Sequence, residues 1–174
     1  TDLLQKIKDK TAKVAVVGLG YVGLPFAVEK AKVGYHVLGI EQNAKRADRV
    51  NAGDNYIKDV DDAELKELTE KGLIVATTEF ERVRDCDVVI VCVPTPLTKN
   101  LNPELKYVTD VTHEIAQYLR PGQLISLEST TYPGTTEDVM LPILAVTGLK
   151  VEDEFFLAHS PERVDPGNQR DTTK

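Results

Sequence analysis

The stretch from Lys13 to Glu41 constrains the fold of this chain more than any other part of it. Residues 14–17 (Val-Ala-Val-Val) are a continuous apolar run of strand length, as expected for a strand that is covered on both faces. Gly18-Leu19-Gly20-Tyr21-Val22-Gly23 follows at once, with the spacing G-x-G-x-x-G. In this spacing the first glycine allows a tight turn, the second lets a pyrophosphate approach the backbone, and the third lets a helix pack closely on the strand. The sequence therefore predicts a dinucleotide-binding turn, with a plain strand–helix junction as the alternative.

The residues after the glycine turn complete this pattern. Residues 21–32 carry apolar side chains at helical spacing, and a second predicted strand, residues 36–40, ends at Glu41. Glu41 comes 23 residues after Gly18, close to the ~20 that separate the turn from the acid that binds ribose hydroxyls. An acid at this point repels a 2′-phosphate, so the sequence predicts NAD rather than NADP. Arg46 weakens this preference, because a nearby arginine can accept such a phosphate.

Strands and helices alternate along the rest of the chain, which predicts an α/β fold: a Rossmann-type doubly wound parallel sheet in the order 3-2-1-4-5-6. Six strands are predicted, at residues 14–17, 36–40, 73–76, 88–93, 124–127 and 155–158. Helices are predicted within residues 1–12 and at 21–32, 43–52, 61–71, 106–119 and 134–145. Asp61 and Glu64 are predicted to cap one of these helices, and Pro142 is expected to kink or end the last. We treat residues 1–174 as one domain.

Charge and composition exclude several classes of partner. The chain has 28 acidic and 21 basic residues, a formal net charge of −7, which argues against binding to nucleic acid or to an anionic membrane. The longest apolar runs have strand length, and the N-terminus lacks the pattern of a signal peptide, so we expect a cytoplasmic protein. Cys86 and Cys92 fall within one predicted strand segment without the spacing of a metal or redox pair. No metal site is expected.

Polar loops follow the strands at the edge where such sheets bind ligands. Residues 93–97 (Val-Pro-Thr-Pro-Leu) form a stiff loop with one hydroxyl, which suits either a ligand contact or a rigid exit from the sheet. Residues 128–136 are rich in hydroxyls, more than the expected helix cap by Thr135 or Thr136 requires. Residues 159–167 bring together two carboxylates and an arginine, a side chain suited to bidentate phosphate or carboxylate binding.

Taken together, GLGYVGLP, CVPTPL, LESTTYPGTT and SPERVDPGN occur in the order and at the strand ends that resemble the NAD domain of the UDP-glucose/GDP-mannose dehydrogenase family. The resemblance covers residues 12–170. The segments TTYPGTT and PERVDPGN are most similar to the branch acting on UDP-N-acetylglucosamine or UDP-N-acetylmannosamine. It implies oxidation of a sugar C6 alcohol to a carboxylate in two steps with two NAD⁺. A cysteine thiolate captures the intermediate aldehyde in this family, but the family's lysine, asparagine and cysteine would follow residue 174.

The resemblance also implies roles for residues in the polar loops. Thr95, with the adjacent Pro94, would contact NAD near the nicotinamide. Thr130 matches the family's catalytic threonine, which orders a water or proton-transfer network, and Thr131 next to it would also meet the cofactor. Glu162 matches a carboxylate of the acid–base steps, and Arg163 and Val164 match positions that meet the nucleotide-sugar. The chain departs from the UDP-glucose branch after Glu162, where the second acid of that branch falls at Pro166 rather than at Asp165.

These observations predict the cofactor domain of a nucleotide-sugar 6-dehydrogenase, which is inactive alone and acts on a UDP-sugar as part of a homodimer when complete. One alternative is a stand-alone NAD-sensing regulatory module, which would have no use for the threonine cluster and the Glu162–Arg163 pair. The other is the cofactor domain of a different NAD-dependent hydroxy-acid dehydrogenase. Neither Cys86 nor Cys92 is expected to be the nucleophile, because each reads as a small buried hydrophobe.

Overall fold

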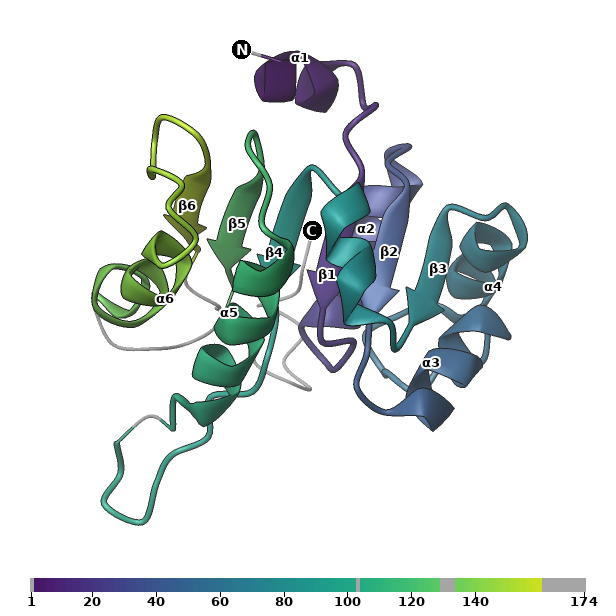
Figure 1. The fold of residues 1–174 in the computed structure, drawn as a ribbon. Helices are drawn as coiled ribbons and strands as arrows, with labels where there is room; N and C mark the ends of the chain where they lie inside the picture. The colour runs from purple at the N-terminus through teal and green to yellow at the C-terminus, as the bar shows by residue number, and fades with distance from the viewer. Residues whose placement is uncertain (1, 103, 129–133, 161–174) are drawn as a thin grey trace.

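Six parallel strands form one sheet at the centre of the described part of the chain (Figure 1). The computed structural model describes residues 2–102, 104–128 and 134–160. The strands are β1 (Val14–Val17), β2 (Val37–Ile40), β3 (Ile74–Thr77), β4 (Val88–Val91), β5 (Leu124–Leu127) and β6 (Phe156–His159). Their order is β3-β2-β1-β4-β5-β6, and every neighbouring pair is parallel. The predicted fold class and strand order are therefore confirmed.

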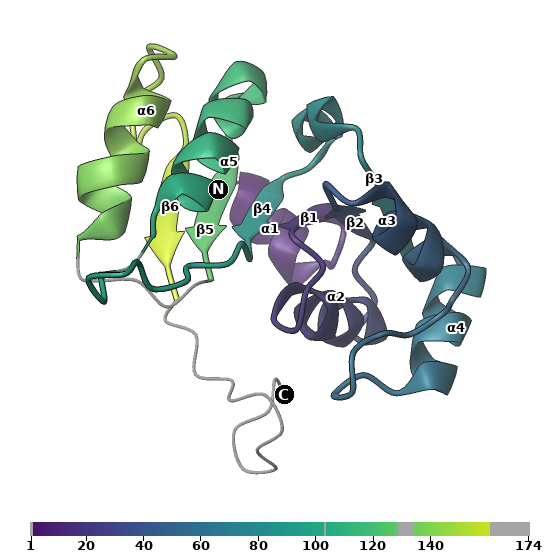
Figure 2. The same ribbon diagram turned by 90° about the horizontal axis from the view of Figure 1, so that it is seen from below.

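Helices cover both faces of the sheet (Figures 1 and 2). The helical elements are α1 (Asp2–Lys8), α2 (Gly23–Lys32), α3 (Ala44–Asn51), α4 (Asp62–Glu70), η1 (Phe80–Asp85), α5 (Lys106–Tyr118), η2 (Thr136–Met140) and α6 (Leu141–Ala145). Side chains from α2, α3 and α4 pack against one face, and side chains from η1, α5, η2 and α6 pack against the other. Among the described residues, no helix has the length and apolar character needed to span a bilayer.

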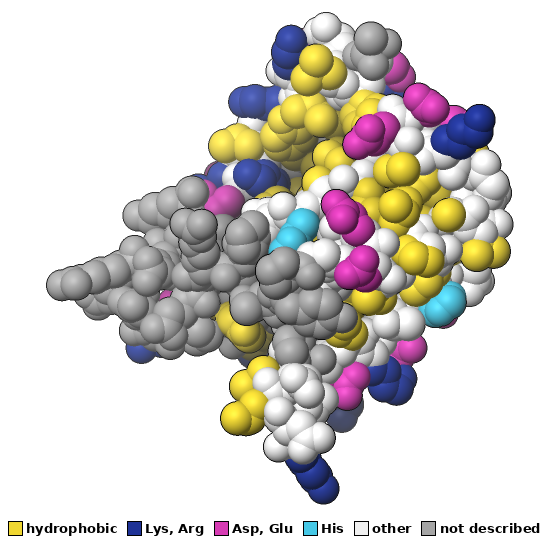
Figure 3. Space-filling model, turned by 90° about the vertical axis from the view of Figure 1, so that its left-hand side faces the viewer, with side chains coloured by type: hydrophobic (Ala, Val, Ile, Leu, Met, Phe, Trp, Pro, Cys, Tyr) yellow, Lys and Arg dark blue, Asp and Glu magenta, His cyan; other side chains and the backbone are white. Residues whose placement is uncertain are grey.

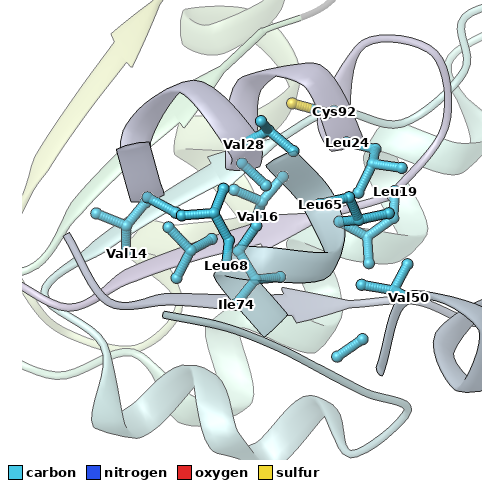
Figure 4. Packing of buried hydrophobic residues seen from close by; sticks show 14 of the residues in the cluster. Val14, Val16, Leu19, Leu24, Val28, Val50, Leu65, Leu68, Ile74 and Cys92 are labelled. Carbon is cyan, nitrogen blue, oxygen red and sulfur yellow. The ribbon is translucent and has the colours of Figure 1, made fainter. Parts of the chain in front are cut away.

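The two central strands, β1 and β4, are buried along their whole length, which explains their uninterrupted runs of apolar residues. Alternate side chains of β1 point to opposite faces: Val14 and Val16 join the cluster under α2, while Ala15 and Val17 join the one under α5. Figure 4 shows part of the first cluster, in which side chains from α2, α3, α4 and four strands meet. Two separate apolar layers thus fix β1 at the centre of the molecule.

Several predicted boundaries and helix ends can be compared with the structure. One half of the predicted capping pair of α4 is present, since the Asp61 carboxylate accepts a hydrogen bond from the Glu64 N–H at 3.0 Å. The Glu64 carboxylate instead pairs with Lys32 at 3.0 Å. Pro142 does not end the last helix: residues 136–140 form a π-helix, and Pro142 lies in the first turn of α6, where its missing N–H costs little. Thr135 precedes the π-helix, but its side chain makes no capping bond. The short helix η1 was not predicted.

The two cysteines do not share one strand, contrary to the expectation from sequence. Cys86 follows η1 and Cys92 comes directly after β4, which ends two residues earlier than predicted. Both are buried and neither is in a disulfide, as expected for small hydrophobes. Burial, with the charges of Asp85 and Asp87 beside it, raises the pKa of Cys86 to about 11. This thiol is therefore protonated at neutral pH and is not a nucleophile.

Candidate functional site

The carboxyl ends of the strands lie along one edge of the sheet, which Figure 2 views directly. The parallel register places Val17 beside Ile40 on one side and beside Val91 on the other. Hydrogen bonds continue this ladder past the strand ends, from Gly18 N–H to the Ile40 carbonyl at 2.9 Å and from Cys92 N–H to the Val17 carbonyl at 2.8 Å. The glycine turn thus begins at the point where the strand order reverses, between β2 and β4. Ligands of doubly wound sheets bind at this switch point.

The three glycines of the turn are required for different reasons. Gly18 has a φ of +92°, and a Cβ there would lie 2.6 Å from the Cys92 carbonyl oxygen. A Cβ at Gly23 would lie 1.7 Å from the Gly18 carbonyl oxygen, closer than any atoms can pack. At Gly20, by contrast, a Cβ would meet no atom of the described residues within 4 Å. The fold itself therefore needs Gly18 and Gly23, whereas Gly20 keeps space open beside the backbone.

Backbone N–H groups at the start of α2 face this open space. Helix α2 begins at Gly23, and Leu24 donates the first of its hydrogen bonds, to the Gly20 carbonyl at 3.1 Å. In the described part of the chain, the N–H groups of Gly20, Tyr21 and Val22 make no hydrogen bond to a protein acceptor. Val22, the residue before the helix, has no side-chain cap either. Unpaired N–H groups at the positive end of a helix dipole form a site for an anion such as a phosphate.

The residue between the first two glycines holds the turn against the sheet. Leu19 is fully buried, and its side chain packs on Gly39 in β2, where a Cβ would lie 2.6 Å from Leu19 Cδ1. A glycine inside an apolar strand is the sequence signal of such a close approach, although the sequence analysis did not single out Gly39. Leu19 thereby ties the turn to the second strand.

Glu41 follows β2 at the same edge and is only 5% exposed. The Arg46 guanidinium donates to its Oε1 at 3.1 Å, and the Asn43 N–H donates to its Oε2 at 3.3 Å. Asn43 also caps α3 by accepting a hydrogen bond from the Arg46 N–H. Each carboxylate oxygen can accept more than one hydrogen bond, so Glu41 keeps acceptor capacity for ribose hydroxyls. Arg46 is engaged by Glu41, which reduces its capacity to receive a 2′-phosphate.

The segment after β4 extends past the carboxyl edge of the sheet (Figure 1). Pro94 is exposed and Thr95 is half-buried at its start. Two backbone hydrogen bonds close it on itself, from Thr98 to Asn102 and from Glu104 to Pro96, both at 2.7 Å. The remaining predicted site residues, Thr130, Thr131, Glu162, Arg163 and Val164, lie outside the described residues.

Within residues 2–102, 104–128 and 134–160, no three His, Cys, Asp or Glu side chains are grouped so that they could hold a metal ion. His159 ends β6 at this edge, and His113 lies on the exposed side of α5. The described site is a backbone cradle with one buried acid, which fits a dinucleotide.

Comparisons with known proteins agree with this geometry. A family model for the "UDP-glucose/GDP-mannose dehydrogenase family, NAD binding domain" matches residues 12–173. The UDP-N-acetyl-D-glucosamine 6-dehydrogenase of Pseudomonas aeruginosa is 40% identical over 161 residues, covering 92% of this chain and 37% of that protein. The UDP-N-acetyl-D-mannosamine dehydrogenase of Pyrococcus horikoshii is 37% identical, with 89% and 37% covered.

A solved structure extends the agreement to three dimensions. The GDP-mannose dehydrogenase of Pseudomonas aeruginosa, in a ternary complex, superimposes with a TM-score of 0.82 at 30% identity. The match covers 88% of this chain and 36% of that one. The chain thus spans little more than a third of the length of the relatives it matches.

Proposed function

This chain belongs to the UDP-glucose/GDP-mannose dehydrogenase family, as its NAD-binding domain, and from this premise we propose that it is the cofactor-binding part of a nucleotide-sugar 6-dehydrogenase. The reaction is the oxidation of the C6 alcohol of a UDP-sugar to a carboxylate, with one water consumed and two NAD⁺ reduced. Support for a UDP-N-acetylhexosamine as substrate comes from the names of the relatives, which include dehydrogenases of UDP-N-acetyl-D-glucosamine and UDP-N-acetyl-D-mannosamine.

One observation carries the cofactor role: the contrast between Gly20 and the two glycines that flank it. Gly18 and Gly23 are held by contacts inside the protein, but no contact with the described residues requires a glycine at position 20. The space that a Cβ would occupy lies next to unpaired N–H groups at the start of α2. A phosphate that approaches the backbone explains both features.

The residues of the chain divide the binding of the dinucleotide among them. NAD, when bound, supplies the acceptor for the hydride. The N–H groups of Gly20, Tyr21 and Val22 bind the pyrophosphate, while Glu41 accepts hydrogen bonds from the ribose hydroxyls. Thr95 and Pro94 contact the nicotinamide end, because their segment leaves the sheet beside the glycine turn. We assign the proton-transfer network to Thr130 and Glu162, cofactor contact to Thr131, and substrate contact to Arg163 and Val164.

The arrangement around Glu41 favours NAD over NADP. A 2′-phosphate would meet the buried carboxylate of Glu41 at this position, and like charges repel. Arg46, the cation that contacts this carboxylate among the described residues, is 3.1 Å from it and half-exposed. The ion pair with Arg46 stabilises the Glu41 carboxylate in place. This ion pair must break before Arg46 can bind a phosphate.

The family reaction also implies where the complete enzyme works. We place it in the cytoplasm, where NAD and nucleotide-sugars are available, as a homodimer that binds neither membrane nor nucleic acid. The net charge of −7 supports the last two points, because an acidic surface repels anionic lipids and phosphates of nucleic acids.

Isothermal titration of the protein with NAD⁺ and NADP⁺ tests the cofactor role. We expect saturable binding of NAD⁺ and affinity for NADP⁺ that is lower by at least about tenfold, a difference of about 1.4 kcal/mol. No heat of binding with either cofactor would contradict the proposal. The substrate class is tested in the full-length enzyme by following NADH formation with a panel of UDP- and GDP-sugars.

A further inference from the structure

We propose that Tyr56 is a positioning residue for the cofactor: by holding the Leu19 carbonyl, its hydroxyl fixes the glycine turn so that the Gly20 N–H faces the pyrophosphate. This inference rests on the proposed function. Tyr56 lies in the connection between α3 and α4, 37 residues along the chain from Leu19, and belongs to none of the motifs identified in the sequence. Its hydroxyl donates to the Leu19 carbonyl oxygen at 2.5 Å.

The connection that carries Tyr56 is itself fixed by the side chain of Asn55. Asn55 Oδ1 accepts a hydrogen bond from the Ile57 N–H at 2.8 Å, so the residues on either side of Tyr56 are bonded across it. Asn55 Nδ2 donates to the Val60 carbonyl at 2.6 Å and to the Asp62 carboxylate at 2.8 Å. The tyrosine therefore approaches the glycine turn from a rigid support, as a residue that positions another group must.

The bond to Leu19 controls the direction of a neighbouring N–H. The Leu19 carbonyl and the Gly20 N–H belong to the same peptide unit, which is trans, since the described residues contain no cis peptide bond. In a trans peptide the two groups point in opposite directions. While Tyr56 holds the carbonyl, the Gly20 N–H points away from Tyr56, and it makes no hydrogen bond to the described protein. Glycine has the widest conformational freedom of all residues, so the backbone at Gly20 depends on an external contact to fix its orientation.

The ring of Tyr56 also connects the glycine turn to Glu41. The guanidinium carbon of Arg46 lies 5.3 Å from the ring centroid, and that of Arg49 lies 5.2 Å from it. Arg46 in turn donates to Glu41, and Arg49 is held by Asp54 at 2.7 Å. Burial raises the pKa of Tyr56, so the hydroxyl stays protonated and remains a donor at neutral pH. One side chain thus links the pyrophosphate cradle to the acid assigned to the ribose.

Replacement of Tyr56 by phenylalanine tests this role, because it removes the hydroxyl and keeps the ring. We expect the affinity for NAD⁺, measured by titration calorimetry, to fall about two- to tenfold, the loss expected for one hydrogen bond. ADP-ribose, which has the pyrophosphate but no nicotinamide, should lose the same factor. In ¹H–¹⁵N spectra of the protein without cofactor, the Gly20 amide resonance should shift.

Tyr35→Phe is the matched control. The Tyr35 hydroxyl donates to the Ile7 carbonyl at 2.7 Å, so the same atom is removed from the same kind of bond, but at the opposite edge of the sheet. This variant should bind NAD⁺ like the wild type and leave the Gly20 resonance in place.

The possible failures are separable. If the wild type binds no NAD⁺, the proposed function falls and this inference with it. If the wild type binds but Tyr56→Phe binds equally well, or if Tyr35→Phe weakens binding as much, the positioning role is wrong and the proposed function stands.

Discussion

The two halves of the sheet differ in how completely the described residues cover them. In the half made of β1, β2 and β3, helices α2, α3 and α4 cover one face, and within β3 only Val75 is exposed, at 40%. Two of these helices begin with a side-chain cap. In the other half the edge strand β6 is mostly exposed, with Phe156 at 36%, and Val146 after α6 is 87% exposed. Figure 3, which views the α6 and β6 side, shows hydrophobic side chains at the surface between acidic ones. The half to which we assign most of the cofactor contacts is therefore the better enclosed one.

The proposed site draws unequally on the two halves. The residues proposed to contact the cofactor between Gly20 and Glu41 are held by residues of the enclosed half, including Leu19, Gly39 and Tyr56. The other half carries Thr95, also a proposed contact, in a segment that extends beyond the sheet with Leu97 64% and Leu101 75% exposed. We therefore expect changes in the first half to separate cleanly into those that affect the fold and those that affect binding.

The largest effect should come from Gly23→Ala. Its Cβ would lie 1.7 Å from the Gly18 carbonyl oxygen, so the helix must move away from the strand. We expect a loss of about 3 kcal/mol or more in the free energy of unfolding, at the upper end for overpacking. Urea denaturation measures it. A variant as stable as the wild type would show that the glycine turn is not locked by internal packing.

Gly20→Val should separate binding from folding in the same turn. A Cβ at this position meets no protein atom within 4 Å, so the midpoint of unfolding should change little. The affinity for NAD⁺ should fall on the order of 100-fold, because the side chain would occupy the space of the pyrophosphate. Fluorescence titration measures this, with Gly23→Ala as the contrasting variant. Normal NAD⁺ binding would reduce the motif to a structural turn.

A substitution at Asp87 tests how the two halves are joined at the opposite edge of the sheet. Burial alone would raise the pKa of Asp87, but hydrogen bonds from the Lys13 N–H (2.9 Å), Arg120 (3.1 Å) and Lys6 (3.2 Å) hold it below its ordinary value. A carboxyl group whose pKa is lower in the folded state than in the unfolded state stabilises the fold at pH values above its unfolded-state pKa, about 3.9. This stabilisation is lost as the pH falls through the folded-state pKa.

Asp87→Asn should therefore lower the free energy of unfolding at pH 7 by about 1–3 kcal/mol and reduce its dependence on pH below about 4. Asp54→Asn is the control, since Asp54 is exposed and also has a lowered pKa, from its hydrogen bonds with Arg49. The control should change stability much less, because a solvent-exposed ion pair contributes little to the fold. Equal losses in both variants would mean that the halves are not joined through Asp87.

The smallest effect expected is a change of cofactor preference in Glu41→Ala. Loss of the carboxylate removes hydrogen bonds to the ribose and releases Arg46 from its 3.1 Å ion pair. The affinity for NAD⁺ should fall about tenfold, while that for NADP⁺ stays constant or rises. Titration of both cofactors measures the ratio, and Arg46→Ala should keep the preference for NAD⁺. Equal affinity of the wild type for both cofactors would remove the assignment of Glu41.

The sequence by itself determined the elements and their order. β1 and β5 lie at the predicted residues, the other four strands and the predicted helices are within a few residues of their predicted bounds, and Asp61 caps α4 as expected. These features depend on neighbours in the chain: apolar periodicity, caps and glycine spacing are local, so they can be read locally. The glycine turn and Glu41 fall in the same category. The assignments of Thr130 and Glu162 remain predictions.

Only the tertiary structure decided which glycine serves the fold and which leaves space for a ligand. It also revealed the contacts of Tyr56 with Leu19, of Leu19 with Gly39, and of Asp87 with Lys6 and Arg120. Each joins residues that lie far apart along the chain, so no short pattern encodes it. A tyrosine in a connection or a glycine in a strand has many possible partners, and the packing of helices on the sheet selects one.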